Sequence, residues 1–146
     1  MEEVYDQSDN IFAVPPYLFL DAFDTAKQRY RTIPYDFTID ANGIYNTGVF
    51  GMTPKDTVDA NHNPIKIWRF NITRYVQNFL TRREPLFDLR LSTPYTLKEL
   101  LQISPGSDID ENLGFNPDIL EGRVRLGGGN HPAQRMKLRI IYTKIN

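Results

Sequence analysis

The chain of 146 residues has no cysteine. Disulfide bonds, thiol catalysis, zinc ribbons and iron–sulfur ligation are therefore excluded. An excess of either charge is also lacking, because 17 basic residues are matched by 18 acidic ones and the formal net charge is −1. A near-neutral chain lacks the basic surface with which proteins neutralise nucleic-acid phosphates, so no nucleic-acid partner is expected. No segment approaches the roughly 18 consecutive apolar residues of a membrane helix, and the sequence predicts no transmembrane segment.

What the chain does have is frequent interruption by glycine and proline. Nine glycines and ten prolines separate short runs that are rich in β-branched and aromatic residues. Such spacing is typical of many short strands in a sandwich or barrel. The length is that of a single domain, at roughly 100–200 residues each. The sequence therefore predicts one all-β domain over residues 1–146, an antiparallel, jelly-roll-like β-sandwich, with residues 1–10 disordered.

Alternating apolar residues locate the expected strands, and Tyr35–Asp40 is the clearest of them. The Ala41–Asn42–Gly43 turn after it predicts a tight hairpin with Ile44–Phe50. In Met136–Ile145 the apolar residues share one face and Ile141 interrupts the other, which predicts a strand buried on both sides within a sheet. The other expected strands are Tyr17–Leu20, Ile65–Phe70, Leu86–Leu91 and Glu121–Leu126, the last pairing with the C-terminal strand through a glycine-rich loop.

One short α-helix is predicted near residues 71–80. Asn71 is a suitable N-cap residue, and apolar residues follow it at helical spacing. Three other segments have weaker patterns. Asp21–Arg31 allows a short helix, Thr96–Leu101 allows a helical turn, and the acidic run Ser107–Asn112 is typical of a mobile loop.

Aromatic side chains are the best candidates for binding a ligand. The chain has eight tyrosines, nine phenylalanines and one tryptophan, and most lie on alternating strands or on the helix face, where they are expected in the core. Tyr17, Tyr30 and Tyr95 lie at or near loops and are candidates for stacking on a sugar or a peptide. Asn130 and His131 belong to a glycine-rich loop whose backbone a partner could approach closely, and they complete the predicted ligand-binding residues.

Catalytic and metal-binding patterns are weak. No serine lies in a Gly-x-Ser-x-Gly motif, and no set of nucleophile, base and orienting residue can be named, which indicates a non-catalytic protein. Neither His62 nor His131 has the spacing of a metal motif. Asp108, Asp110 and Asn112 have the oxygen spacing of a calcium loop, but the glycine and the twelfth-position glutamate of that motif are absent. Calcium is therefore a weak candidate and no other cofactor is expected.

Two stretches resemble known families. Phe70–Leu80 with Leu89–Ser92 resembles a signature that opens a helical turn in extracellular, carbohydrate-binding-like β-sandwich modules. Arg125–Pro132 with Met136–Tyr142 resembles the C-terminal end of the domain-of-unknown-function 4270 family of Bacteroidetes, whose members are predicted outer-membrane lipoproteins. The resemblance covers roughly residues 65–146. It implies a location in the cell envelope, on the periplasmic or surface side of the outer membrane, and a lipid anchor on the full-length protein.

The start of the chain bears on the same expectation. Met1 is followed by Glu2 and Glu3, which is the wrong flank for a signal peptide, so we expect the chain to be a fragment of a longer protein.

The function expected is a module that binds a glycan or an envelope protein. A purely structural domain and a glycan hydrolase with an unrecognised site are the alternatives. An aromatic-lined groove would favour a glycan, a flat apolar patch a protein partner, and a cleft with paired carboxylates a hydrolase.

Overall fold

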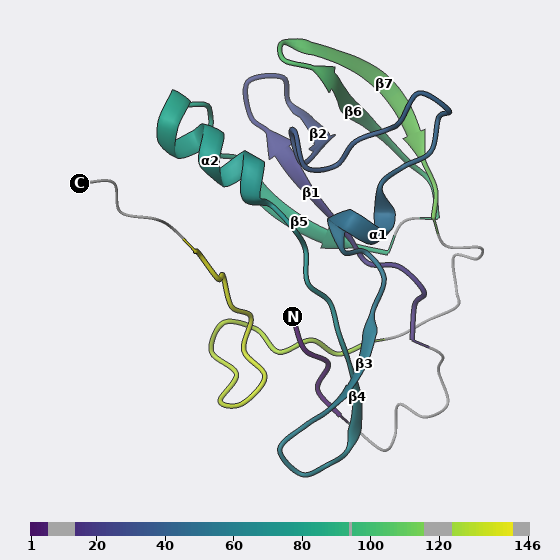
Figure 1. Cartoon of the computed structure of the whole chain (residues 1–146), viewed down its shortest axis with the longest axis vertical. Coiled ribbons are helices and arrows are strands. Elements are labelled where there is room, and N and C mark those ends of the chain that lie inside the picture. Colours follow the sequence, from purple (N-terminus) through teal and green to yellow (C-terminus); the bar gives the residue numbers. More distant parts are fainter. Residues whose placement is uncertain (6–13, 94, 116–123, 142–146) are drawn as a thin grey trace.

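The computed structural model describes residues 1–5, 14–93, 95–115 and 124–141, and strands dominate it (Figure 1). Neither helix in this part of the chain has the length and apolar character that crossing a membrane needs. In chain order the elements are β1 (Phe19–Asp24), β2 (Arg29–Thr32), α1 (Thr47–Phe50), β3 (Lys55–Val58), β4 (Pro64–Ile67), α2 (Thr73–Arg82), β5 (Asp88–Ser92), β6 (Leu97–Ser104) and β7 (Ser107–Leu113).

Five strands form the main sheet, in the order β5-β1-β2-β6-β7. β1 lies between β5 and β2 and pairs with both in antiparallel fashion, as its apolar residues predict for an inner strand. β2 and β6 run parallel, with Arg31 opposite Leu100. The sheet is therefore mixed, and the expectation of a purely antiparallel arrangement is wrong. The reason is the long crossover between these two strands, which contains both helices and strands β3, β4 and β5.

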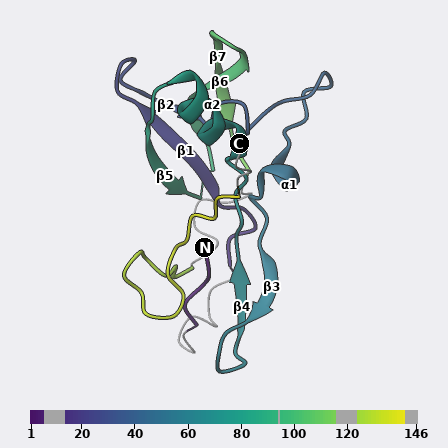
Figure 2. The same ribbon diagram turned by 60° about the vertical axis from the view of Figure 1, so that its left-hand side comes forward.

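The remaining two strands, β3 and β4, project from one end of the main sheet (Figure 2). The N-terminal residues extend this second sheet, since Glu2 bridges Ile67 and Glu3 bridges Leu126. Backbone hydrogen bonds join Trp68 N–H to Met1 O (2.8 Å) and Val4 N–H to Arg125 O (2.8 Å). Residues 1–5, expected to be disordered, are thus held between β4 and the segment near Leu126. Residues 6–10 lie outside the described residues.

The core lies between the main sheet and the segment that follows β2. Phe19 packs edge-on against Phe37, with ring centroids 5.2 Å apart, and Phe37 packs in the same way against Phe50. Leu101 and Leu113 from β6 and β7 are fully buried in the same cluster. The prediction that most aromatic residues form the core is confirmed for these three phenylalanines.

The predicted helix is confirmed as α2, displaced by two residues. The N-cap residue is Ile72, so the prediction of Asn71 at that position is wrong; Asn71 lies one residue earlier, where its Oδ1 accepts hydrogen bonds from the Thr73 N–H (3.2 Å) and hydroxyl (2.7 Å). Tyr75 is the buried residue of the helix, and Val76 is half-buried. The helical spacing places Phe79 or Leu80 on the buried face; Phe79 is half-buried and Leu80 is 65% exposed. The helix therefore covers the sheet mainly with its first turns.

Two hairpins replace segments for which helix or loop was expected. Asp21–Arg31, the candidate short helix, contains most of the β1–β2 hairpin, and Gln28 takes a positive φ of 53° at its turn. Thr96–Leu101 and Ser107–Asn112 fall in the β6–β7 hairpin. The acidic run forms a strand because basic residues of the β1–β2 hairpin neutralise it. Arg31 Nη2 lies 3.0 Å from Asp108, and Arg29 pairs with Asp110.

The hairpin expected over residues 35–50 forms only in part. Gly43 has the positive φ of 80° that its turn requires, and Ile39 bridges Tyr45. Beyond that bridge, hydrogen bonds of the Asn46 side chain take the place of backbone hydrogen bonds between the two expected strands. Its Oδ1 accepts from Thr38 N–H (2.9 Å) and its Nδ2 donates to Asp36 O (2.8 Å). The chain then turns into α1 instead of continuing as a strand.

The C-terminal strand is the largest correction. Residues 136–141 carry no strand, and Met136, Leu138, Ile140 and Ile141 are 49, 65, 57 and 81% exposed. A position buried on both sides within a sheet is therefore wrong for this segment. Among the described residues, one backbone hydrogen bond, from Met136 N–H to Gly127 O (3.1 Å), joins the C-terminal segment to the residue after Leu126, and Leu126 itself bridges Glu3. Glu121–Arg123 and Tyr142–Ile145 lie outside the described residues.

Candidate functional site

A cleft of about 430 Å³ opens where three connections meet at one end of the main sheet. These are the β1–β2 turn, the α2–β5 loop and the β6–β7 turn, which lie together at the top of the molecule in Figure 1. We call it the Tyr35 cleft. Its lining residues are Asp24, Thr25, Ala26, Lys27, Arg31, Pro34, Tyr35, Tyr75, Glu84, Pro85, Leu86, Phe87, Gln102, Pro105 and Gly106.

The local sequence holds each of the three connections in place. Asp24 Oδ1 accepts the backbone N–H groups of Ala26 (3.1 Å) and Lys27 (3.0 Å), which closes the β1–β2 turn. α2 ends at Arg82, the next residue, Arg83, takes the left-handed conformation with φ 55°, and Pro85 follows two residues later. Gly106 provides the positive φ of 77° in the β6–β7 turn. Turns fixed in this way give the cleft rigid walls.

Tyr35 has a strained backbone that three other segments stabilise. Its φ is +67°, an unfavourable value for a bulky side chain. Its N–H donates to Gln102 Oε1 (3.1 Å), its hydroxyl donates to Glu84 Oε1 (2.8 Å), and its carbonyl accepts from Arg74 Nη1 (3.2 Å). Burial and the neighbouring Glu84 carboxylate raise the pKa of the Tyr35 hydroxyl, so it stays a donor. Strain held by several contacts is characteristic of functional positions.

Two further rings line the Tyr35 cleft. Tyr75 from α2 and Phe87 from the α2–β5 loop are nearly parallel, with a 12° interplanar angle and centroids 6.4 Å apart. The Tyr75 hydroxyl accepts the Phe87 backbone N–H (2.7 Å), which locks the two residues together. The Arg31 guanidinium lies 5.3 Å from the centre of the Phe87 ring. The cleft is thus lined by three aromatic rings from separate parts of the chain.

Charged groups at the cleft are largely paired with one another. Arg31 binds Asp24 (3.1 Å) and Asp108 (3.0 Å), and Lys27 also binds Asp108.

The ion pairs of β7 also bear on the weak prediction of a calcium site at Asp108, Asp110 and Asn112. Asp108, Asp110 and Asn112 lie two residues apart along β7, but cationic side chains already bind both carboxylates. In the described part of the chain, no three His, Cys, Asp or Glu residues are placed to hold a metal.

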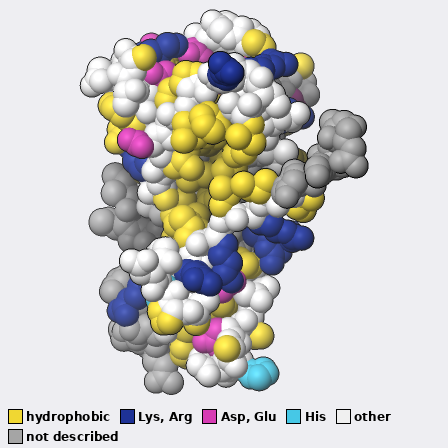
Figure 3. Space-filling model, turned by 90° about the vertical axis from the view of Figure 1, so that its left-hand side faces the viewer, with side chains coloured by type: hydrophobic (Ala, Val, Ile, Leu, Met, Phe, Trp, Pro, Cys, Tyr) yellow, Lys and Arg dark blue, Asp and Glu magenta, His cyan; other side chains and the backbone are white. Residues whose placement is uncertain are grey.

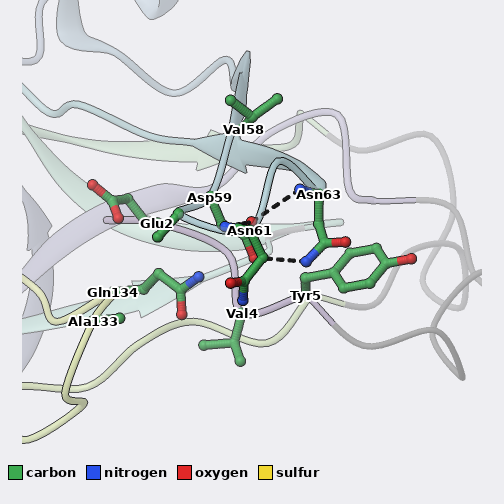
Figure 4. A pocket seen from close by; sticks show the side chains of 10 residues that line it. Glu2, Val4, Tyr5, Val58, Asp59, Asn61, Asn63, Ala133 and Gln134 are labelled. Carbon is green, nitrogen blue, oxygen red and sulfur yellow. Dashed lines mark hydrogen bonds between the residues drawn. The ribbon is translucent and has the colours of Figure 1, made fainter.

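A second hollow, of about 390 Å³, lies between the β3–β4 turn and the N-terminal residues (Figure 4). Asp59 organises its turn by accepting hydrogen bonds from Asn61 N–H (2.8 Å), Asn63 N–H (2.9 Å) and Asn63 Nδ2 (3.0 Å). Of these, the Asn63 amide contributes most to lowering the pKa of Asp59. Figure 4 shows the Tyr5 ring and the Gln134 amide beside this turn. We call this hollow the Asn pocket. Its lining residues are Glu2, Val4, Tyr5, Val58, Asp59, Ala60, Asn61, Asn63, Ala133 and Gln134.

The five predicted ligand-binding residues do not come together. Tyr17 is half-buried against Phe115 (6.3 Å between centroids), and the Arg90 guanidinium lies 3.4 Å from the centre of the Tyr30 ring. Tyr95 is 48% exposed and lines neither hollow. Asn130 is exposed in its loop.

His131 is the one predicted residue with a link to a hollow. Its Nδ1 accepts the N–H of Gln134 (2.9 Å) and is within 3.4 Å of the N–H of Ala133, and both of these residues line the Asn pocket. His131 therefore positions the pocket wall without forming part of it. The cleft residues that sequence reasoning did not select are Tyr35, Tyr75 and Phe87, because their alternating or helical spacing assigned them to the core. That assignment is correct for Tyr75, which is 4% exposed and belongs to the core cluster as well as to the cleft wall. The available signal was proline close to two of these residues, since Pro34 precedes Tyr35 and Pro85 lies two residues before Phe87.

A buried pair of carboxylates lies elsewhere on the main sheet. Asp21 is fully buried and Glu99 is 1% exposed. Arg90 binds both, through Nε to Asp21 Oδ1 (2.9 Å) and through Nη2 to Glu99 Oε1 (2.9 Å). Burial, together with the neighbouring Asp21 carboxylate, raises the pKa of Glu99 to about 9. Neither carboxylate lines either hollow, so this pair is not the open pair of a hydrolase cleft.

Comparison with known proteins adds no relative: the chain matches no protein-family model, no curated protein and no solved structure. The candidate site therefore stands on its own geometry.

Proposed function

We propose that the protein is a non-catalytic, carbohydrate-binding module and that the Tyr35 cleft is its binding site. The observation that carries the proposal is Tyr35 itself, a strained aromatic residue held at a cleft by Gln102, Glu84 and Arg74. A fixed aromatic ring gives the apolar face of a sugar a surface on which to stack at little entropic cost.

The polar groups of the cleft suit the hydroxyl groups of a sugar. Glu84 uses one oxygen for the Tyr35 hydroxyl, and a carboxylate can accept about four hydrogen bonds. Gln102 accepts from Tyr35 through Oε1, while its amide nitrogen is a donor. The volume of about 430 Å³ lies within the roughly 300–1,000 Å³ typical of ligand sites. One or two sugar units are the ligand that these dimensions support.

The Tyr35 cleft has two carboxylates, and both are already engaged: Asp24 by Lys27 and Arg31, and Glu84 by the Tyr35 hydroxyl. Binding is favoured over hydrolysis because Asp24 is poorly suited to act as a general acid. Although burial opposes ionisation of Asp24, its hydrogen bonds with Lys27 and Arg31 prevail and lower its pKa. A glycosidase needs one carboxyl that keeps its proton near neutral pH, together with an opposed carboxylate. Asp24 therefore supports a binding role.

We further propose that the two sheets form a β-sandwich-like module of a cell-envelope lipoprotein. The N-terminal residues and the segment near Leu126 widen the β3–β4 sheet, which supports a second layer. The envelope location and the lipid anchor rest on the resemblance of the C-terminal segment to the outer-membrane lipoprotein family. A purely structural domain remains the alternative.

Titration with oligosaccharides tests the proposal. Candidates selected on a glycan array are titrated calorimetrically against the wild-type chain and three variants. Tyr35→Ala removes the ring and should weaken binding at least tenfold, whereas Tyr35→Phe keeps the ring and should stay within a few-fold. Tyr95→Ala, at an exposed tyrosine outside the cleft, is the matched control. Equal affinity for Tyr35→Ala and wild type would place the site elsewhere, and no binding on the array would reject the function.

A protein partner is the second candidate, because apolar side chains gather on the side of the molecule that carries α2 (Figure 3). Leu80, Leu86 and Leu89 are 65, 64 and 47% exposed. An exposed apolar patch of this kind often marks an interaction surface. Leu80→Ser would separate the two functions, since it should abolish partner binding and leave oligosaccharide affinity unchanged.

A further inference from the structure

The segment of residues 135–141 exposes basic and apolar side chains together. Basic residues at 135, 137 and 139 alternate with apolar residues at 136, 138 and 140, and Ile141 follows. The apolar side chains are 49–81% exposed, although all of them are large. The segment belongs to no helix or strand, and one backbone hydrogen bond, from Met136 N–H to Gly127 O, holds it among the described residues. Little of its apolar surface is therefore buried by the rest of the described molecule.

The positive charges of this segment are not neutralised by the described part of the chain. Arg135, Lys137 and Arg139 are exposed and take part in no ion pair there. No Asp or Glu occurs between positions 124 and 141. Three cations on seven residues are thus available to an anionic partner, in contrast to the paired charges at the Tyr35 cleft.

Arg69 adds to the same positive surface. Burial contributes most to lowering the pKa of the Met1 amine, and the charges of Arg69 and Lys137 lower it further, whereas Glu2 opposes them. Both cations therefore lie near the first residue, with Glu2 as the acidic group beside them. Figure 3 shows Lys and Arg side chains gathered next to the apolar area on the side of the molecule that carries α2. Exposed apolar and cationic side chains thus share this side.

We propose that residues 135–141 bind the surface of an anionic lipid bilayer. Such a surface presents negative headgroups directly above an apolar layer, and interfacial segments bury their apolar side chains roughly 5–10 Å into that boundary. Met136, Leu138 and Ile140 enter the apolar layer. The basic residues alternate with them, and their long side chains allow the charged ends to stay at the level of the lipid phosphates.

A lipid surface accounts for both properties of the segment. A soluble polyanion would bind the cations and leave the apolar side chains in water. An uncharged apolar surface would bury the apolar side chains and leave the cations unpaired. The binding is peripheral, and the inference does not depend on the carbohydrate site.

Vesicle sedimentation tests the proposal. The wild-type chain is mixed with vesicles of phosphatidylcholine alone or of phosphatidylcholine and phosphatidylglycerol in equal amounts. Each basic residue near an anionic surface contributes about fivefold to binding, so the mixed vesicles should be preferred at least tenfold. Added sodium chloride should weaken binding to the mixed vesicles, because salt screens exposed charges. No binding to the mixed vesicles, or equal binding to both kinds, would overturn the proposal.

Two double variants separate the contributions of charge and apolar insertion. Lys137→Glu with Arg139→Glu should weaken binding to the mixed vesicles at least tenfold. Leu138→Ser with Ile140→Ser should also weaken it at least tenfold, because the inserted apolar area is lost. All four positions are exposed, so both proteins should keep the circular dichroism spectrum of the wild type. Unchanged binding of the serine variant would leave charge alone as the cause, and the proposed insertion would be wrong.

Matched controls change exposed residues elsewhere. Lys55→Glu on β3 and Val49→Ser on α1 should bind the mixed vesicles as the wild type does. A loss as large as that of the segment variants would contradict the assignment to residues 135–141. Because the chain has no cysteine, Leu138→Cys and Val49→Cys can each carry one polarity-sensitive fluorophore. The emission should shift to shorter wavelength on vesicles only for the label at 138, and no shift there would also overturn the proposal.

Discussion

The protonation state of Glu99 is set by its neighbours Arg90 and Asp21. Its Oε1 accepts from Arg90, while its buried Oε2 has no hydrogen-bond partner among the described residues. A proton on Oε2 resolves this, because the resulting hydroxyl group can donate to Asp21. Burial and Asp21 raise the pKa of Glu99 to about 9, so the group holds this proton at neutral pH.

The first prediction is that Glu99 makes this protein more stable near pH 5 than near pH 9. The ordinary pKa of Glu99 is 4.5 and that in the folded chain is about 9, so the contribution is complete below pH 4.5 and is lost as pH rises toward 9. In that interval the folded state binds the extra proton, and the free energy of unfolding falls by up to ~1.4 kcal/mol per pH unit. Urea unfolding at a series of pH values measures the slope.

Glu99→Gln is the matched variant, since its amide can donate to Asp21 without titrating. We expect it to fold and to show a flatter dependence of unfolding free energy on pH than the wild type. Identical slopes for the two proteins would mean that Glu99 does not carry the buried proton.

At the scale of elements, the start of α2 depends on a residue far away in sequence. Asp36 Oδ1 accepts Arg74 N–H (3.1 Å) and Asp36 Oδ2 accepts Tyr75 N–H (2.8 Å), two donors that the helix itself cannot satisfy. Burial raises the pKa of Asp36, and these hydrogen bonds oppose that shift. Asp36 thus acts as a helix cap supplied from 38 residues earlier in the chain.

Replacing this cap should destabilise the whole domain. Asp36→Ala leaves two N–H groups without their acceptor and should lower the free energy of unfolding by about 2 kcal/mol. Asp56→Ala removes a carboxylate whose side chain is 86% exposed and should change it by less than ~0.5 kcal/mol. Chemical denaturation compares the two, and equal effects would show that the Asp36 contacts do not stabilise the helix.

The sequence predicts the elements that have a strong local pattern, and it fails for segments whose secondary structure is determined by contacts with residues far away in the chain. The apolar spacing from Ile72 to Leu80 predicts α2, and the uninterrupted apolar run Tyr17–Leu20 predicts an inner strand, which the structure places at Phe19–Asp24. The acidic run Ser107–Asn112 was expected to be a loop because its neutralising partners, Arg29 and Arg31, are about 80 residues away. The side chain of Asn46, which ends the hairpin ladder, has no local signature either.

At the scale of the whole molecule, we expect the buried core, and not the C-terminal segment, to determine the free energy of unfolding. Ile141 is 81% exposed, so Ile141→Ser should change the free energy of unfolding by less than ~0.5 kcal/mol. Leu101 is fully buried in the core, and Leu101→Ala should cost about 2–5 kcal/mol. Thermal melts at low protein concentration compare the two variants. A large loss for Ile141→Ser would show that the C-terminal segment belongs to the core, as its sequence pattern predicts.

The candidate site is likewise formed by residues that lie far apart in the sequence. The sequence indicates ligand binding through aromatic residues, but it favours the loop tyrosines Tyr17, Tyr30 and Tyr95. Tyr35 becomes a candidate only when Glu84 and Gln102, 49 and 67 residues away, are placed beside it. Local periodicity cannot reveal contacts at that separation.

NMR chemical-shift mapping tests the central claim most directly. An isotopically labelled wild-type chain is titrated with an oligosaccharide that binds it, and the backbone amide signals are followed. The account predicts that the largest shifts cluster at the β1–β2 turn, at Tyr35, in the α2–β5 loop and at the β6–β7 turn. Shifts confined to the Asn pocket, or to the loop of Asn130 and His131, would contradict the assignment of the Tyr35 cleft.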